Sequence, residues 1–187
     1  MGTSLTLAQI FGRELEALGG MVHEASSTSD IVGIISEIAA KSGSKRIITS
    51  RLGLENEDHF LTELRKRGFE LTELENLTQP RAELASADLA VTCADIIIAS
   101  TGTIVMTTNQ DEQRLATCLP RVHIAIAHST KIVSNPQDVN DYVRDHLVKD
   151  PHCAISFISG PSRTADIEMK LILGVHGPHE LHVILKR

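Results

Sequence analysis

The run from Ile158 to Glu168, Ile-Ser-Gly-Pro-Ser-Arg-Thr-Ala-Asp-Ile-Glu, combines residue types that can bind an anion. An apolar, β-rich segment ends in a Gly-Pro turn, and the hydroxyls of Ser162 and Thr164 follow as helix-capping groups. A helix that begins there directs unpaired backbone N–H groups and the positive end of its dipole at one point, and Arg163 adds a cation beside it. The run therefore predicts a site for a carboxylate or a phosphate, although a capped helix start without any ligand fits the same residues.

A second polar group, Ser100-Thr101-Gly102-Thr103, lies between two apolar β runs. Its glycine would let the backbone approach a ligand closely, whereas the alternative is an ordinary solvent-exposed turn of a β-hairpin. We expect the two polar runs to share one pocket for a small anion. The predicted binding residues are Thr101, Gly102, Thr103, Ser162, Arg163 and Thr164, with Asp95, Asp166 and Glu168 in support. The last two of these acids would cap the helix or orient the arginine.

Histidines supply the candidates for proton transfer and, in one cluster, for a metal. His176, His179 and His182 surround a Gly-Pro turn, but the turn separates the first from the others, and a strand would place the other two on opposite faces. We therefore expect no metal site in this chain. His123 lies in an apolar strand, where a histidine is usually a hydrogen-bonded interior residue, and a role in a pocket is the alternative. His123 and His176 are the candidate catalytic proton carriers.

The cysteines, Cys93, Cys118 and Cys153, are far apart in the sequence and odd in number. This pattern is typical of a reducing compartment and excludes an iron–sulfur cluster or a structural zinc site of the usual spacing. Cys118 and Cys153 lie in apolar segments and are expected in the core, whereas Cys93 lies in an expected loop and is the candidate for reactivity. The chain also lacks the dinucleotide-binding fingerprint, the P-loop, the nucleophile elbow and the H-E-x-x-H motif.

The composition excludes several classes of protein. The chain has 187 residues, 42% of them apolar and only 3% aromatic, so its core must consist of Ile, Leu, Val and Ala. Its net charge is −6 and it has no basic run, which argues against a nucleic-acid surface. No apolar run approaches about 20 residues, and Met1–Ile10 has no signal-peptide pattern, so we expect a cytoplasmic protein without a membrane span.

Alternating strands and helices predict a single α/β domain over residues 1–187, with a mostly parallel sheet flanked by helices. The predicted strands are Met21–Ala25, Arg46–Thr49, Phe69–Leu74, Ile96–Ala99, Ile104–Thr108, Val122–Ala127, Cys153–Ser159 and Leu181–Leu185. Ser29 or Asp30 is the predicted cap of a helix that runs to about Lys41. The other predicted helices are His59–Lys66, Ala82–Ala87, Glu112–Cys118 and Pro136–Leu147, and a helix or a turn follows from Thr164. The β runs on either side of Gly102 indicate a hairpin or a tight corner within the sheet.

Four blocks of the sequence, in this order, resemble the LUD domain family, whose members include lactate-utilisation protein C. The blocks are Ala94-Asp-Ile-Ile-Ile-Ala-Ser-Thr-Gly-Thr103, Leu119-Pro-Arg-Val-His-Ile124, the run from Ile158 to Glu168, and Gly174-Val-His-Gly-Pro-His-Glu-Leu-His182. The resemblance covers the chain closely from Ala94 to the C-terminus, and the first half through its strand–helix rhythm. It implies a fold similar to that of ribose-phosphate isomerase, glucosamine-phosphate deaminase and CoA-transferase proteins.

The resemblance also implies a role in the oxidation of L-lactate to pyruvate, in which the family member works beside partner subunits that carry iron–sulfur centres. This chain would then be the cluster-free subunit or an accessory protein, with no cofactor of its own and a small anionic ligand. Two alternatives remain open, namely a stand-alone enzyme that acts on a sugar phosphate or an acyl thioester, and a regulator that binds a small molecule. Fold alone does not choose among them.

The chain departs from the family pattern at two positions. The family usually has glutamate where this chain has Ser100, and a serine hydroxyl cannot replace a carboxylate as base or nucleophile unaided. The family also usually has glycine where this chain has Cys93. Both differences concern the site and leave the predicted fold unchanged.

Overall fold

The computed structural model describes residues 5–50, 52–164, 172–173 and 177–187. The described helices are α1 (Leu7–Ala17), α2 (Thr28–Ser42), α3 (Glu57–Lys66), α4 (Pro80–Ser86), α5 (Asp111–Ala116) and α6 (Asn140–Lys149). None of these helices is both long enough and apolar enough to cross a lipid bilayer. The described strands are β1 (Met21–Ala25), β2 (Arg46–Thr49), β3 (Glu70–Glu73), β4 (Leu89–Ala94), β5 (Ile96–Ile98), β6 (Thr103–Thr108), β7 (Val122–His128), β8 (Ile132–Val133), β9 (Ala154–Ile158), β10 (Arg163–Thr164), β11 (Ile172–Leu173) and β12 (Glu180–Lys186).

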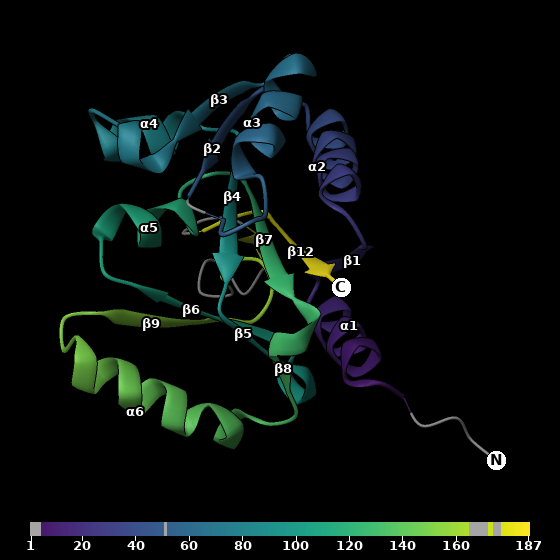
Figure 1. The fold of residues 1–187 in the computed structure, drawn as a ribbon, viewed down its shortest axis with the longest axis vertical. Helices are drawn as coiled ribbons and strands as arrows, with labels where there is room; N and C mark the ends of the chain where they lie inside the picture. Colours follow the sequence, from purple (N-terminus) through teal and green to yellow (C-terminus); the bar gives the residue numbers. More distant parts are fainter. Residues whose placement is uncertain (1–4, 51, 165–171, 174–176) are drawn as a thin grey trace.

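Six of these strands form a parallel sheet in the order β1-β12-β7-β4-β2-β3 (Figure 1). The order reverses at β2, because the chain passes from β2 to β3 on one side and then returns to β4 on the other. In open parallel sheets, the carboxyl ends of the strands at such a reversal form a crevice in which ligands bind. The topology therefore points to the carboxyl ends of β2 and β4.

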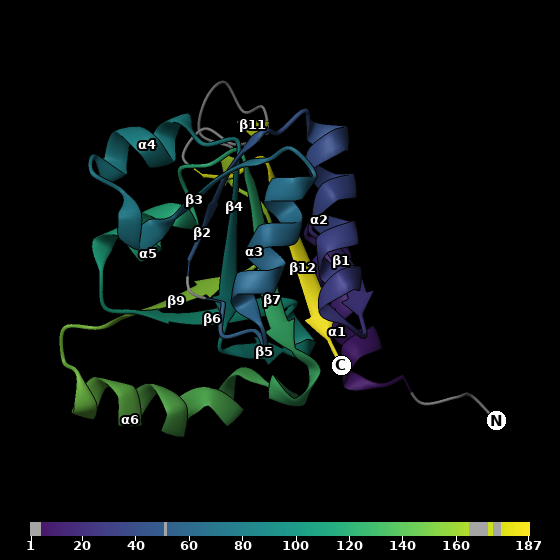
Figure 2. The ribbon, with the colours of Figure 1, turned by 45° about the horizontal axis from the view of Figure 1, so that its top comes forward.

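Helices α2 and α3 cover one face of the parallel sheet (Figure 2). Ile31 and Ile35 of α2 and Phe60 of α3 lie at helical spacing and are fully buried against Ile47 and Ile124 of the strands. Burial of each such side chain contributes about 1.5–3 kcal/mol to stability. The apolar stripe on these helices therefore fixes them to the sheet.

Local hydrogen bonds determine where α2 begins. The Ser27 hydroxyl accepts a hydrogen bond from the Asp30 N–H (3.1 Å), and the Asp30 carboxylate accepts one from the Ser27 N–H (2.9 Å). This capping box satisfies backbone groups that a helix start leaves unpaired. The predicted cap at Ser29 or Asp30 is therefore wrong by two or three residues, since Ser27 is the N-cap and the helix begins at Thr28, although Asp30 takes part in the capping box.

The opposite face of the parallel sheet carries α1, α4, α5 and a second sheet, with the order β8-β5-β6-β9. Phe11 and Leu15 of α1 are buried between the two sheets together with Ile97, Ile104 and Val183. Helix α6 packs on the far side of the second sheet (Figures 1 and 2). The second sheet thus lies between the parallel sheet and α6.

The predicted α/β class, with a mostly parallel sheet between helices, is confirmed. The hairpin predicted around Gly102 is present as β5 and β6, but it belongs to the second sheet and not to the parallel one. Neither α1 nor β4 is among the predicted elements. The sequence of β4 is Leu-Ala-Val-Thr-Cys-Ala, and its small residues give a weak β signal even though β4 lies near the centre of the sheet.

The helix or turn predicted from Thr164 falls on residues that lie outside the described ranges, apart from Thr164 itself. Arg163–Thr164 forms β10, which pairs antiparallel with Ile172–Leu173 in β11. Because Arg163 and Thr164 are extended, Ser162 does not cap a helix that begins directly after it. Asp166 and Glu168, which were predicted to support that helix, lie outside the described residues.

Candidate functional site

The two predicted polar runs lie next to each other, because β6 pairs antiparallel with β9. The Thr103 hydroxyl lies 2.7 Å from the Thr101 hydroxyl and 2.7 Å from the Ser159 hydroxyl, within hydrogen-bonding distance of both. Ser162 follows after the turn, and its N–H donates to the Pro178 carbonyl (3.0 Å). The structure therefore brings the runs together through a hydroxyl network.

Glycines in this region make room for helix α1. Gly102 has a left-handed conformation (φ 58°), and a Cβ there would lie 2.7 Å from the Glu14 carbonyl carbon and 2.8 Å from the Leu15 Cα. A Cβ on Gly160 would similarly lie 2.8 Å from the Leu18 carbonyl oxygen. The close backbone approach expected at Gly102 is therefore an approach to the backbone of α1.

Arg163 is exposed and extends toward the end of α1. Its Cζ atom lies 3.5 Å from the position that a Cβ on Gly19 would occupy, just beyond the C-terminus of that helix. A cation near a helix C-terminus interacts favourably with the helix dipole, by about 0.3–1 kcal/mol at an exposed position. This location gives Arg163 a structural role, and the anion site around it stays a prediction.

We expect Arg163→Ala to weaken phosphate binding by about 1.5–3 kcal/mol, the scale of a hydrogen bond to a charged group. The midpoint of thermal unfolding should change little, because the side chain is exposed. Calorimetric titration and thermal melts would measure both effects, with Arg144→Ala on the exposed face of α6 as the control. A large loss of stability with unchanged phosphate binding would show that Arg163 only supports the end of α1.

A separate pocket of about 130 Å³ lies at the carboxyl ends of β2 and β4, where the strand order reverses. Residues from four parts of the chain line it: Ser50 after β2, Thr92, Cys93 and Asp95 at the end of β4, Met106, Thr107 and Thr108 of β6, and Gln113 of α5. We call it the Asp95 pocket. Hydroxyl groups and one carboxylate dominate its polar lining.

Asp95 is held in place by the second sheet. Its carboxylate accepts a hydrogen bond from the Thr107 N–H (2.6 Å), and its own N–H donates to the Val105 carbonyl (2.9 Å). The Thr107 hydroxyl in turn lies 2.6 Å from the Tyr142 hydroxyl on α6. Burial raises the pKa of Tyr142 to about 12, so this phenol stays protonated. Asp95 is therefore connected to α6 as well as to β6.

His123 lies in the middle of the parallel sheet and is completely buried. Its Nε2 atom is 2.8 Å from the hydroxyl of Thr92, which lines the Asp95 pocket. Burial lowers the pKa of His123 to about 4, so the imidazole is neutral at pH 7. His123 thus has a hydrogen-bonded interior position, and it touches the pocket only through Thr92.

The expectation for Cys93 needs correction, because this residue lies in β4 and not in a loop. Burial raises the pKa of its thiol to about 11, with a smaller contribution from Asp95. Only a thiolate is an effective nucleophile, and at neutral pH almost all of this thiol is protonated. Cys93 therefore lines the pocket with a protonated, unreactive thiol.

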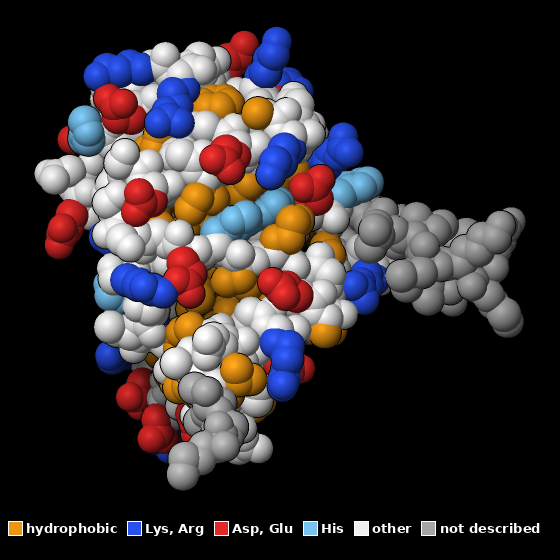
Figure 3. Space-filling view, turned by 90° about the vertical axis from the view of Figure 1, so that its right-hand side faces the viewer, with side chains coloured by type: hydrophobic (Ala, Val, Ile, Leu, Met, Phe, Trp, Pro, Cys, Tyr) orange, Lys and Arg blue, Asp and Glu red, His pale blue; other side chains and the backbone are white. Residues whose placement is uncertain are grey.

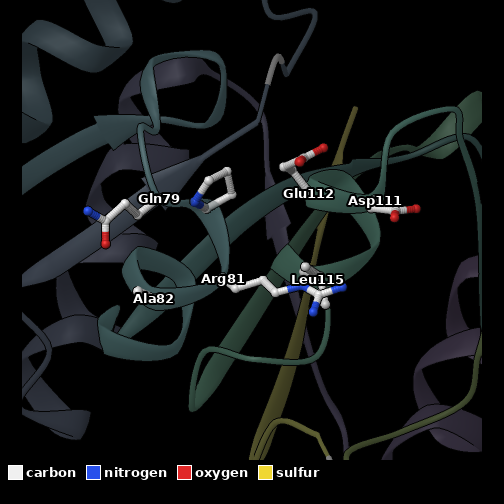
Figure 4. A pocket seen from close by; sticks show the side chains of 7 residues that line it. Gln79, Arg81, Ala82, Asp111, Glu112 and Leu115 are labelled. Atoms are coloured by element: carbon white, nitrogen blue, oxygen red, sulfur yellow. The ribbon is translucent and has the colours of Figure 1, made fainter.

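Two other cavities flank this part of the fold. One, of about 430 Å³, lies between α4 and α5; Gln79, Arg81 and Ala82 come from the α4 side, and Glu112 and Leu115 from α5 (Figure 4). The other, of about 400 Å³, shares Ser50 with the Asp95 pocket. Its charged lining is acidic: Glu57, Asp58, Glu73 and Glu75.

Of the three histidines around the Gly-Pro turn, the structure describes His179 and His182. His182 is buried and its Nδ1 atom lies 3.0 Å from Nε2 of His23 on β1, while Nε2 of His182 is 3.2 Å from the Glu180 carboxylate. His179 is exposed, and His176 lies outside the described residues. Histidine and hydrophobic side chains gather on the face formed by α1, β1 and α2 (Figure 3). Across the described ranges, no group of three or more His, Cys, Asp or Glu is placed to bind a metal, and the expectation of no metal site stays a prediction.

Comparisons with known proteins agree with this architecture. The sequence model of the LUD domain matches residues 8–185. Lactate utilization protein C of Anoxybacillus flavithermus is 40% identical over 92 residues, and that of Bacillus subtilis is 38% identical over 102 residues. These matches cover 49% and 53% of this chain but only 40% and 42% of the two relatives, so the chain matches less than half of their length. A crystal structure of a DUF162 family protein from Deinococcus radiodurans superposes with a TM-score of 0.69 over 98% of this chain and 100% of that one, and its 21% identity bears on the fold alone.

Proposed function

This chain belongs to the LUD domain family, and from that premise we propose that it takes part in lactate utilisation. The observation that carries the proposal is the identity of 38–40% with proteins named Lactate utilization protein C. Since the matches cover less than half of those proteins, the proposal concerns the process and does not transfer their whole activity. The Asp95 pocket is the place in the fold where we expect a small ligand of that process.

In more detail, we propose that the chain is a cluster-free subunit or accessory protein in the oxidation of L-lactate to pyruvate. That oxidation removes two electrons, which need an acceptor. Cys93, Cys118 and Cys153 are all free thiols without the spacing of cluster ligands, and the sequence has no dinucleotide fingerprint. The iron–sulfur centres would therefore be carried by partner proteins, and this chain would bind or position the substrate.

We expect deletion of the gene to abolish growth on L-lactate as the sole carbon source, and the intact gene to restore it. We also expect the isolated chain not to reduce a redox dye when it is given L-lactate, because its sequence has neither the cysteine spacing of cluster ligands nor a dinucleotide fingerprint. An extract of the cells that carry the gene is the positive control for the dye assay.

These two measurements separate the possible roles. Unchanged growth of the deletion strain on L-lactate would overturn the proposed process. Dye reduction by the pure chain would contradict the subunit role and favour a stand-alone enzyme.

A further inference from the structure

Strand β9 is an outer strand of the second sheet and lacks the features that usually protect such a strand. Its sequence is Ala-Ile-Ser-Phe-Ile, with no charged residue and no proline, and within the described ranges it pairs only with β6. Proteins commonly protect an outer strand with charges, with proline or by keeping it short, because its unpaired backbone groups bind other strands. The free edge of β9 is therefore suited to accept another strand.

The other outer strands of the two larger sheets do carry such protection. Strand β1 contains Glu24, whose side chain is 53% exposed, and β3 begins with Glu70 and ends with Glu73. Strand β8 has only two residues. Like charges that face each other in paired strands are destabilising, so these glutamates oppose the pairing of two copies. Strand β9 has five residues and no charge, so nothing of this kind opposes its pairing.

Exposed apolar side chains are concentrated in the segment that contains α6 and β9. Phe157 is 50% exposed, and Leu147 and Val148 at the end of α6 are 44% and 76% exposed. They are three of the seven large hydrophobic side chains that are exposed in the described part of the chain. Phe157 lies opposite Val105, which packs toward α6, so the Phe157 ring lies on the α6 face of the sheet. A strand that pairs with β9 would cover this ring.

The hydrogen bonds of β6 show how the backbone of β9 is oriented. The Val105 carbonyl accepts from the N–H of Asp95, which directly precedes β5, and the Thr107 N–H donates to the Asp95 carboxylate. Val105 and Thr107 therefore direct their backbone groups away from β9. Because this direction alternates along a strand, Met106 directs its groups at β9, where Ser156 lies opposite. Ser156 is thus bonded to β6.

The backbone groups of Ile155 and Phe157, on either side of Ser156, point to the free edge of β9 by the same alternation. No backbone hydrogen bond outside the strand ladders involves either residue in the described ranges. The two residues lie symmetrically about Ser156. A second β9 that runs antiparallel, with Ser156 opposite Ser156, places Ile155 of each strand opposite Phe157 of the other and pairs all of these groups.

We propose that two copies of this chain associate through β9, about a two-fold axis at Ser156. The four strands of each second sheet then form one continuous sheet of eight, with both copies of α6 on the same face. Phe157 of each copy packs on Ile155 of the other, an aromatic–β-branched pair of the kind that stabilises neighbouring strands. The same surface is used on both copies, so the assembly closes at two.

A second copy is the occupant that fits this edge, because the strand matches its own symmetry and no like charges meet between the paired strands. Two paired strands of five residues form a small contact compared with the about 1,200–2,000 Å² that stable interfaces bury. Exposed side chains at the end of α6 therefore have to contribute to the contact, and we expect a dissociation constant in the micromolar range.

Analytical ultracentrifugation of the purified full chain over a series of concentrations tests the proposal. We expect a reversible equilibrium between monomer and dimer. Phe157→Lys should raise the dissociation constant at least about tenfold, because a charge replaces an aromatic side chain at the centre of the contact. Met21→Lys is the matched control, since Met21 is a 37% exposed residue on the outer strand β1, and it should leave the dimer unchanged.

Hydrogen exchange followed by NMR tests the register of the two strands. The amides of Ile155 and Phe157 should exchange slowly in the dimer and rapidly after dilution to monomer. The amide of Ser156 is the internal control, because it faces β6 and should stay protected at every concentration. Ser156→Cys should form a disulfide-linked dimer when diamide oxidises the two thiols, because opposite residues of this type have Cα atoms about 4.5 Å apart.

Four outcomes would overturn the proposal: a chain that stays monomeric at millimolar concentration, a dimer that persists in Phe157→Lys, a dimer that dissociates in Met21→Lys, or assemblies that grow beyond two copies. Exchange of the Ile155 and Phe157 amides that does not depend on concentration would overturn it as well. So would a Ser156→Cys variant that forms no more linked dimer than the unaltered chain. If Phe157→Lys fails to fold, the dilution series and the exchange measurement on the unaltered chain still decide.

Discussion

Gly102→Ala should lower the free energy of unfolding by about 2–4 kcal/mol. Two costs add: a residue with a Cβ is strained at φ 58°, and the new atom would meet the backbone of α1 at the Glu14 carbonyl carbon and the Leu15 Cα, at 2.7 and 2.8 Å. Because helix backbone cannot move aside as a flexible side chain can, α1 has to shift away from the second sheet. Urea denaturation followed by circular dichroism would measure the loss.

Gly12→Ala is the matched control for this substitution. Gly12 lies within α1, and a Cβ there would have no neighbour within 4 Å. Alanine is favoured over glycine in a helix interior, so this variant should be more stable by about 0.5–1 kcal/mol. A Gly102→Ala variant as stable as the unaltered chain would contradict the packing of α1 against the turn between β5 and β6.

The free energy of unfolding should fall by about 3 kcal/mol as the pH is lowered from 7 to 4. Burial holds the pKa of His123 at about 4, whereas a histidine in the unfolded chain has a pKa of 6.5. Between these values the unfolded state binds the proton and the folded state does not, so stability is fully present above pH 6.5 and is lost as the pH falls toward 4. Burial also lowers the pKa of His23 and of His182, which adds a loss of the same sign.

Urea denaturation at a series of pH values would measure this slope. His123→Gln should flatten it, while His152→Gln at an exposed turn should not change it. Should the His123 variant fail to fold, the titration of the histidine ring protons can be followed by NMR in the unaltered chain. A His123 that titrates near 6.5 would contradict the buried, neutral imidazole.

The fold could be predicted where a single segment carries a strong signal. Arg46–Thr49 and Val122–Ala127 are compact apolar runs, and both are strands of the parallel sheet. Leu89–Ala94 is not among the predicted strands. Several of its side chains are small, which suits a crowded central position in the sheet, and such residues are as common in helices and loops as in strands. The assignment of β5 and β6 to a second sheet depends on contacts with β9, far along the chain, which a local pattern does not contain.

The candidate site was harder to predict than the fold. The polar runs at Thr101–Thr103 and at Ser159–Ser162 do meet, but the nearest large element is α1, which is not among the predicted helices. Asp95 was expected only in a supporting role. The pocket around it forms because β2, β4, β6 and α5 converge, so no spacing within one segment could reveal it. The signal that could have found it was topological, namely the reversal of strand order at β2.

The link between Tyr142 and Thr107 has a practical consequence. The chain has one tyrosine and no tryptophan, so its near-ultraviolet emission is dominated by a single phenol, hydrogen-bonded to the strand that holds Asp95. Helix α6 has no fully buried residue and therefore belongs to the part of the fold that opens most easily. Tyrosine emission thus reports the detachment of α6 from β6, whereas circular dichroism reports the chain as a whole. Tyr142 therefore provides an intrinsic fluorescence probe next to the Asp95 pocket, and no added label is needed.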